Sequence, residues 1–178
     1  MPPDLDNTEC DSPLWRFALD LYAATDVSSA CLALQDSLSA DVNLLLVCCW
    51  VGRHGAYLQT EQIETLDRLV QPWRAEAIVP VRRLRRQLKT AVGPVLPGQS
   101  AGLREIIKSA ELEAEKIELS VLFQALETLP AKNAAGAERG GVIRSNLLHY
   151  LVALNANPNE PLTRDAVETL VRETLTPA

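Results

Sequence analysis

Apolar residues recur at the spacing of a helix along most of the chain, whereas no segment alternates between apolar and polar positions for long enough to predict a strand. A first amphipathic helix begins after Ser12 and Pro13, which form an N-cap and first-turn pair, and ends near Ala24. A second covers residues 25–38, with its apolar positions on one side. The pattern predicts an all-α protein.

The segment that starts at Asp41 differs from these two helices because it is apolar all round. A helix of this kind is buried on every side, so it is predicted to form the centre of the core. Gly52 stands where a left-handed C-cap belongs, and a loop over residues 53–59 is expected to follow it.

Two proline residues interrupt the next helical pattern. A helix capped by Thr60 is expected to end or kink at Pro72. The pattern resumes over residues 73–89, where Pro80 is expected to bend the helix. A Pro- and Gly-rich linker over residues 91–102 then precedes a long helix.

The long helix, predicted from Ser100 to Leu129, has apolar residues on two sides. Its first stripe comprises Leu103, Ile107, Ala110, Ala114, Ile117, Val121 and Ala125. Its second stripe comprises Leu112, Leu119, Phe123 and Leu126. Such a helix is either sandwiched between other helices or binds a partner. The second stripe is therefore a candidate interface for a partner helix or for a second copy of the chain.

The remaining pattern predicts how the chain is divided. Residues 1–11 are expected to form a disordered tail, and residues 12–129 a single helical bundle domain. Residues 130–178 are expected to form a flexible linker and two short peripheral helices, at 143–154 and from Thr163 onward. The chain then contains about seven or eight helices.

Composition narrows the possible functions. Apolar residues make up 47% of the chain but aromatic residues only 4%, which favours packed helices. The net charge of −6 argues against general binding to nucleic acid or to an anionic membrane. The longest apolar stretch, over residues 42–51, is about half as long as a membrane span, and the acidic N-terminus lacks the features of a secretory signal. These observations predict a soluble, cytoplasmic protein.

Cationic residues cluster on one face of the helix predicted over residues 73–89. The cluster comprises Arg82, Arg83, Arg85, Arg86 and Lys89. It is a candidate anion-binding face, because guanidinium groups bind phosphates through paired hydrogen bonds. Two other interpretations remain open: a solvated surface, or pairing with the acidic run of the long helix if the two helices pack antiparallel. That run comprises Glu111, Glu113, Glu115 and Glu118.

No motif predicts a metal site, a cofactor or a catalytic centre. Neither His54 nor His149 has a Glu three residues before it, which the metal sites of ferritin-like bundles require. Neither histidine has a visible catalytic partner, and His149 is expected at the edge of the core. The cysteines at positions 31, 48 and 49 lack the spacing of metal ligands and are expected in the core.

One asparagine and three tryptophans are candidates for a ligand pocket. Asn43 lies near the start of the most apolar helix, where we expect it to cap the helix together with Asp41; a bridge to another helix and a contact to a ligand are the alternatives. Trp15, Trp50 and Trp73 each lie at one end of a helical stretch on its apolar side. If these side chains converge, they line a pocket.

Several motifs together resemble a known family. They are SPLWRFAL (12–19), CLALQD (31–36), ADVNLLL (40–46), PWRAEAIVPVRRLRRQLK (72–89) and IKSAELEAEKIE (107–118). In this order they are similar to an uncharacterised proteobacterial domain-of-unknown-function family of short helical proteins, over roughly residues 12 to 126. The resemblance implies a helical fold but no activity, substrate or catalytic residue.

The sequence leads to two main hypotheses of function. The first is a non-enzymatic adaptor or regulatory module, which contacts a protein partner or a second copy through the second stripe of the long helix. The second is a binding protein or enzyme for an anionic, partly apolar small molecule, held in a pocket between the tryptophans, Asn43 and the arginines around Arg82. Nucleic-acid binding through the arginine face is a third hypothesis, which the net charge disfavours.

Overall fold

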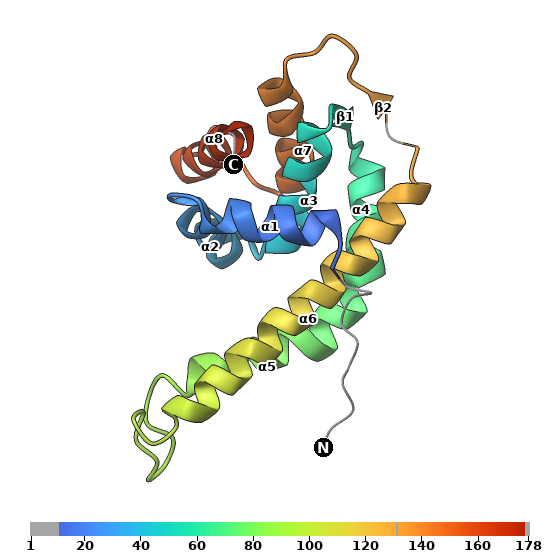
Figure 1. Ribbon diagram of the computed structural model, residues 1–178. Helices are drawn as coiled ribbons and strands as arrows, with labels where there is room; N and C mark the ends of the chain where they lie inside the picture. Colours follow the sequence, from blue (N-terminus) through green and yellow to red (C-terminus); the bar gives the residue numbers. More distant parts are fainter. Residues whose placement is uncertain (1–10, 131, 177–178) are drawn as a thin grey trace.

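The computed structural model describes residues 11–130 and 132–176 (Figure 1). Most of them lie in helices, which confirms the predicted all-α fold. The tail predicted over residues 1–11 lies outside the described residues except for Asp11, which forms an exposed ion pair with Arg16.

The elements follow one another in the order α1 (Pro13–Ala23), α2 (Val27–Leu38), α3 (Val42–Arg53), β1 (Ala56–Tyr57), α4 (Thr60–Trp73), η2 (Arg74–Ile78), α5 (Val79–Gln87), α6 (Ala101–Thr128), β2 (Lys132–Asn133), α7 (Arg139–Ala153) and α8 (Pro161–Leu175). The N-cap predicted at Ser12 is confirmed, because its hydroxyl accepts a hydrogen bond from the Trp15 amide at 3.1 Å. The long helix of the C-terminal half is also confirmed as α6.

Helix α3 forms the centre of the core, as its all-round apolar pattern predicts. Every residue of α3 from Asn43 to Cys49 is buried. Helices α1, α2, α7 and α8 surround it, and α6 crosses one side of the bundle (Figure 1). Cys31, Cys48 and Cys49 are free thiols within this core, where burial raises the pKa of Cys49 to about 12.

Helices α7 and α8 belong to the core, so the interpretation that they are peripheral was wrong. Ile143, Leu147 and Leu151 of α7 and Leu170 of α8 have no exposed surface. Helix α7 packs along α3, and α8 packs against α2 and α7. The physical reason is that a helix that is apolar all round must be covered on every side, and the preceding helices leave one side of α3 open for α7.

Gly52 serves this packing and not the predicted left-handed cap. It lies inside α3 and is buried. A Cβ atom at this position would be only 2.7 Å from the Cα of Ile143 and 2.8 Å from its Cγ1. The missing side chain therefore lets α3 and α7 approach each other closely.

The loop predicted over residues 53–59 contains a short strand that the sequence did not indicate. Strand β1 pairs antiparallel with β2, with Ala56 opposite Asn133 and Tyr57 opposite Lys132. Asn146 of α7 supports the same segment: it accepts a hydrogen bond from the Leu58 amide at 2.9 Å and donates one to the Ala56 carbonyl at 3.0 Å. Strands of two residues are too short to show an alternation of apolar and polar positions, so the hydrophobic pattern could not predict them.

The helical path from α4 to α5 is continuous, with the π-helical segment η2 between them. Pro72 lies inside α4 and does not end it, and Pro80 lies in the first turn of α5. Proline lacks an amide hydrogen, so an α-helix that contains it loses a hydrogen bond and suffers a clash. The wider turn of a π-helix is one way to relieve this conflict within a helix.

Helix α5, the turn over residues 88–100 and the first half of α6 extend away from the other helices as a two-helix arm (Figure 1). In the arm α5 packs against α6 and has no buried residue of its own. The turn at its end is closed by two backbone hydrogen bonds between Val92 and Val95. Below, "the arm" denotes residues 79–114.

No single helix in the described ranges is both long and apolar enough to cross a membrane. Helices α1 and α2 have the length and composition only when taken together, and they are bent by 97° relative to each other.

Candidate functional site

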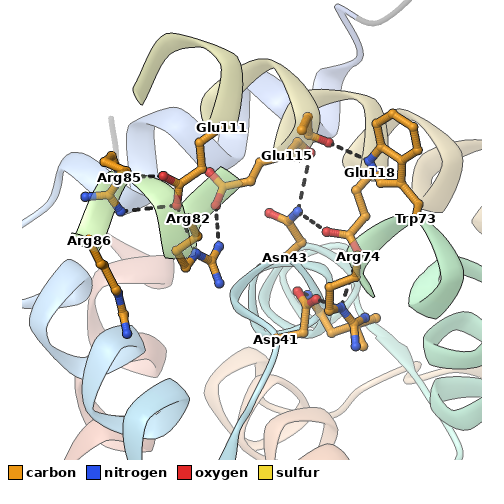
Figure 2. A network of polar contacts seen from close by, with 12 residues as sticks. Asp41, Asn43, Trp73, Arg74, Arg82, Arg85, Arg86, Glu111, Glu115 and Glu118 are labelled. Atoms are coloured by element: carbon orange, nitrogen blue, oxygen red, sulfur yellow. Dashed lines mark hydrogen bonds and ion pairs between the residues drawn. The ribbon is translucent and has the colours of Figure 1, made fainter. Parts of the chain in front are cut away.

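A network of charged and polar side chains lies where α6 crosses α3 and η2 (Figure 2). Asn43 of α3 donates a hydrogen bond to Glu118 Oε2 of α6 at 2.6 Å and another to the Glu115 carbonyl at 3.3 Å. Arg74 of η2 forms ion pairs with Asp41, with Asp67 at 2.8 Å and with Glu118 at 3.4 Å. Side chains from four elements, α3, α4, η2 and α6, thus meet at one cluster, which we call the inner network.

Burial controls the acidity of the inner network. Glu118 is 1% exposed. Desolvation and the nearby carboxylate of Asp41 raise the pKa of Glu118 to about 7, although Asn43 and Arg74 act in the opposite direction. Desolvation likewise raises the pKa of Asp41, against the charge of Arg74. The cluster therefore contains a carboxyl group that changes its protonation near neutral pH.

Asp41 and Asn43 were expected to cap α3 together, but only Asp41 does so. Asp41 caps α3 as predicted, because its Oδ1 accepts a hydrogen bond from the Leu44 amide at 3.2 Å. Asn43 does not cap the helix. It bridges to α6 instead, which was one of the alternatives for this residue.

A second group of charges, the outer network, joins α5 to α6. Arg82 donates to Glu111 at 2.9 Å and to Glu115 at 2.6 Å, and Arg85 donates to both oxygens of Glu111 (Figure 2). Burial opposes ionisation of Glu111, but the hydrogen bonds from Arg85 and Arg82 outweigh it and lower the pKa of Glu111. Desolvation prevails at Glu115 and raises the pKa of that carboxyl group.

The cationic cluster of residues 82–89 is thus paired in part with the acidic run of α6. Such pairing was one of the three interpretations that the sequence left open. Arg82 and Arg85 are engaged by Glu111 and Glu115. Arg86 extends toward α2, where its ion pair with Asp36 is 3.5 Å long and about half exposed (Figure 2). Arg83 and Lys89 are exposed.

A cavity of about 520 Å³ lies between the arm and helices α1 and α2. We call it the groove. Its larger apolar lining residues are Trp15, Leu19, Tyr22, Leu32, Leu46, Leu112 and Leu119. Its charged lining residues are Arg82, Arg85, Arg86, Glu105, Lys108, Glu111 and Glu115. Four of the apolar residues, Leu19, Tyr22, Leu32 and Leu112, are more than a third exposed. The groove is therefore amphipathic and open to solvent.

A smaller cavity of about 270 Å³ adjoins the groove and reaches the inner network. It is lined by Asp41, Arg74 and Glu118 among others. The residues that line both cavities are Gln35, Val42, Asn43, Arg82, Arg86 and Glu115. The two networks therefore border one continuous depression, with its apolar part in the groove and its most polar part beside Glu118.

The predicted pocket of three tryptophans and Asn43 forms only in part. Trp15 and Asn43 line the groove. Trp73 lies elsewhere, with its indole N–H donating to the Ala114 carbonyl at 2.9 Å. Trp50 packs its ring against His54 at a centroid distance of 4.1 Å and borders a separate cavity near the C-terminal end of α8. The tryptophans do not converge because they lie on three different helices, Trp15 on α1, Trp50 near the C-terminal end of α3 and Trp73 at the end of α4.

The second stripe of α6 is also divided by the structure. Leu119 is 1% exposed and belongs to the core, and Phe123 and Leu126 are partly buried against it. Only Leu112 is largely exposed, at 47%, and it lines the groove. Most of the stripe is thus used within the monomer, so it is not the free interface that the sequence suggested.

Sequence reasoning missed three residues of the site. Arg74 and Asp67 gave no signal, because their role depends on the π-helical segment that turns Arg74 toward Asp41 and Glu118. Lys108 lies one turn before Leu112, on the side of α6 that carries the second stripe, and becomes notable only because it lines the groove. The i, i+4 spacing of Glu111 and Glu115 was the one readable signal, since it places both carboxylates on one side of α6.

Within the described residues, no group of three or more His, Cys, Asp or Glu side chains is placed to hold a metal ion. His149 lies at the edge of the core, as expected, with its Nδ1 2.8 Å from the Leu58 carbonyl oxygen. His54 is likewise hydrogen-bonded to backbone, 2.8 Å from the Trp50 carbonyl oxygen.

The fold and the site define a class: an all-helical protein with an amphipathic groove beside a buried network of charges. Residues 13–122, more than half of the chain, match the family described as "Protein of unknown function (DUF2390)". The chain belongs to this family, which confirms the resemblance to an uncharacterised family. No curated protein and no solved structure matches it.

Proposed function

We propose that this chain is a cytoplasmic binding protein for an anionic small molecule with an apolar body, and that the groove is its binding site. The observation that carries the proposal is the composition of the groove, where apolar and charged side chains together line a cavity of about 520 Å³. Small-molecule sites are typically cavities of about 300 to 1,000 Å³ with mainly apolar linings and a few convergent polar groups.

The sign of the expected charge follows from the cations that remain available. Arg82 and Arg85 are neutralised by Glu111 and Glu115. Arg86 has only the long, half-exposed ion pair with Asp36, and exposed pairs contribute little. Lys108 forms no ion pair within the described residues. Arg86 and Lys108 therefore offer two cationic groups, against the single remaining carboxylate Glu105, to the head of a ligand whose body contacts Trp15 and Leu112.

The test uses 8-anilinonaphthalene-1-sulfonate, a fluorescent apolar anion, with decanoate as the competitor. The wild-type chain is expected to bind the probe saturably and to release it to decanoate. Lys108→Glu is expected to weaken the affinity about tenfold, which corresponds to roughly 1.4 kcal/mol, because it replaces an attractive charge with a repulsive one.

The matched control is Arg164→Glu, which makes the same change of charge on α8 at an exposed residue paired with Asp165. It is expected to leave the affinity unchanged. The proposal fails if the wild-type chain shows no saturable binding, or if Lys108→Glu binds the probe as tightly as Arg164→Glu does.

A further inference from the structure

A further cavity, of about 410 Å³, lies on the arm and adjoins the groove. Every residue that lines it is charged: Arg85, Lys89, Arg104, Glu105 and Lys108. Three of them, Arg85, Glu105 and Lys108, also line the groove, so the two cavities are continuous. We call this second cavity the basic cavity, because cations dominate its lining.

The charges of the basic cavity are not balanced by the protein itself. Within the described residues, the side chains of Lys89, Arg104 and Lys108 form no hydrogen bond or ion pair. Arg85 binds Glu111 through Nε and Nη2, which leaves its Nη1 outside these hydrogen bonds. Glu105 is the only carboxylate in the lining, so three unpaired cations face one carboxylate and the cavity has an excess of two positive charges.

Pairing between the two helices of the arm does not account for this cluster. Arg104, Lys108, Glu111 and Glu115 follow one another at helical spacing on one side of α6. Glu111 and Glu115 pair with arginines of α5, whereas the two preceding positions of the same stripe are cations that share the basic cavity with Arg85 and Lys89. Like charges at the i, i+4 spacing of Arg104 and Lys108 destabilise a helix.

We propose that the basic cavity binds the phosphate group of the ligand whose apolar body occupies the groove, so that the ligand is a phosphate monoester of an apolar alcohol. This inference rests on the function proposed above and makes its ligand class specific. A phosphate monoester carries close to two negative charges above its second pKa of about 6, which matches the excess charge of the cavity, whereas a carboxylate carries one. Guanidinium groups bind phosphate through paired hydrogen bonds, and lysine binds it as a point charge.

Isothermal titration calorimetry at pH 8 with dissolved decyl phosphate and with decanoate tests the inference. The two ligands have apolar chains of nearly equal length and differ in the head group. The wild-type chain is expected to bind decyl phosphate about tenfold more tightly than decanoate, because only the phosphate offers a second charge to the basic cavity.

The variant that probes the basic cavity is Arg104→Gln. It is expected to weaken the binding of decyl phosphate about fivefold and to change that of decanoate less than about twofold, because Arg104 lines the basic cavity but not the groove. Lys89→Gln, at an exposed residue outside the helices, is expected to act in the same direction without a change in helical content. Arg83→Gln is the matched control, because it removes a cation from α5 at an exposed residue that lines neither cavity. It is expected to leave both affinities unchanged.

The possible failures are distinct. Equal affinities for decyl phosphate and decanoate would overturn the phosphate assignment and leave the groove as the binding site. The absence of binding by both would overturn the proposed function, and this inference with it. If Arg104→Gln and Lys89→Gln both bind decyl phosphate as tightly as Arg83→Gln does, the phosphate does not lie in the basic cavity. Co-sedimentation with phosphatidylcholine vesicles that contain phosphatidate, without binding of dissolved decyl phosphate, would show a membrane surface in place of a free ligand and overturn the inference.

Discussion

At the scale of single residues, burial raises the pKa of Glu118 far above the ordinary value of a glutamate side chain. The carboxyl group lies beside Asp41, Asn43 and Arg74 with almost no solvent contact, and its pKa is raised from 4.5 to about 7. Arg74 is shared by three carboxylates, so it cannot fully compensate each of them. Glu118 thus bears a desolvation cost that is relieved by a proton.

This shift predicts how stability depends on pH. A carboxyl group whose pKa is higher in the folded than in the unfolded state holds its proton more tightly when folded, so stability falls as pH rises between the two values. The free energy of unfolding of the wild-type chain is expected to decline by about 2 kcal/mol between about pH 5 and about pH 8 through this group. Glu118→Gln is expected to remove most of that decline, as measured by urea denaturation.

The control for Glu118 is Glu168→Gln on α8. Hydrogen bonds from Arg144 lower the pKa of Glu168, so its contribution to stability is present above its unfolded pKa and is lost only as the solution becomes acidic. The variant is expected to keep the decline from about pH 5 to about pH 8. An equally steep decline in Glu118→Gln would show that the inner network does not govern the pH dependence.

At the scale of elements, the contact between α3 and α7 depends on a residue that has no side chain. Sequence position alone suggests that Gly52 ends a helix, since glycine is frequent at C-caps. In the folded chain it lies within α3, and Ile143 fills the space that a Cβ would occupy. The atom nearest to a Cβ at position 52 is the Cα of Ile143, a backbone atom of α7 that cannot turn aside as the end of a flexible side chain can.

Gly52→Ala is expected to destabilise the protein by about 2 kcal/mol, because α3 and α7 must move apart, even though alanine favours helices. Gly102→Ala is the matched control: it lies within α6, and nothing is within 4 Å of its expected Cβ. It is expected to stabilise the chain by about 0.5 to 1 kcal/mol. Urea denaturation of both variants measures the difference, and effects of the same sign would contradict the close approach.

At the scale of the whole molecule, the folding unit extends beyond the part that matches the family. The match ends at residue 122, within α6, whereas α7 and α8 contribute fully buried residues to the core. Helix α7 lies along α3 and places the Tyr150 hydroxyl 2.7 Å from the amide of Asp41, which donates to it. The C-terminal helices therefore support the residues of the inner network.

A chain truncated after residue 130 is expected to lose cooperative unfolding, because one side of α3 is left exposed to water. Circular dichroism during urea titration measures the loss, and a peptide covering residues 138–176 added in trans is expected to restore the transition. A truncated chain that unfolds cooperatively at the wild-type midpoint would show that α7 and α8 are dispensable for the fold.

The sequence by itself determined the helices and the most buried one among them. Spacing at i, i+3 and i+4 is a local property, so it is readable for α1, for the central position of α3 and for the length of α6. The pairing of the arginines with Glu111 and Glu115 was also foreseeable as one of three options, because the linker permits an antiparallel hairpin.

Only the tertiary structure decided which polar and apolar faces meet. The position of α7 beside α3, the turn of Arg74 toward Glu118 and the groove between α1, α2 and the arm each join segments that are distant along the chain. Such contacts depend on how several helices jointly cover a core, and the spacing of apolar residues within one helix does not indicate which helices pack against each other. For the same reason the sequence did not show that Leu112 and Leu119, two members of one apolar stripe, differ in burial: folding buries Leu119 and leaves Leu112 in the open groove.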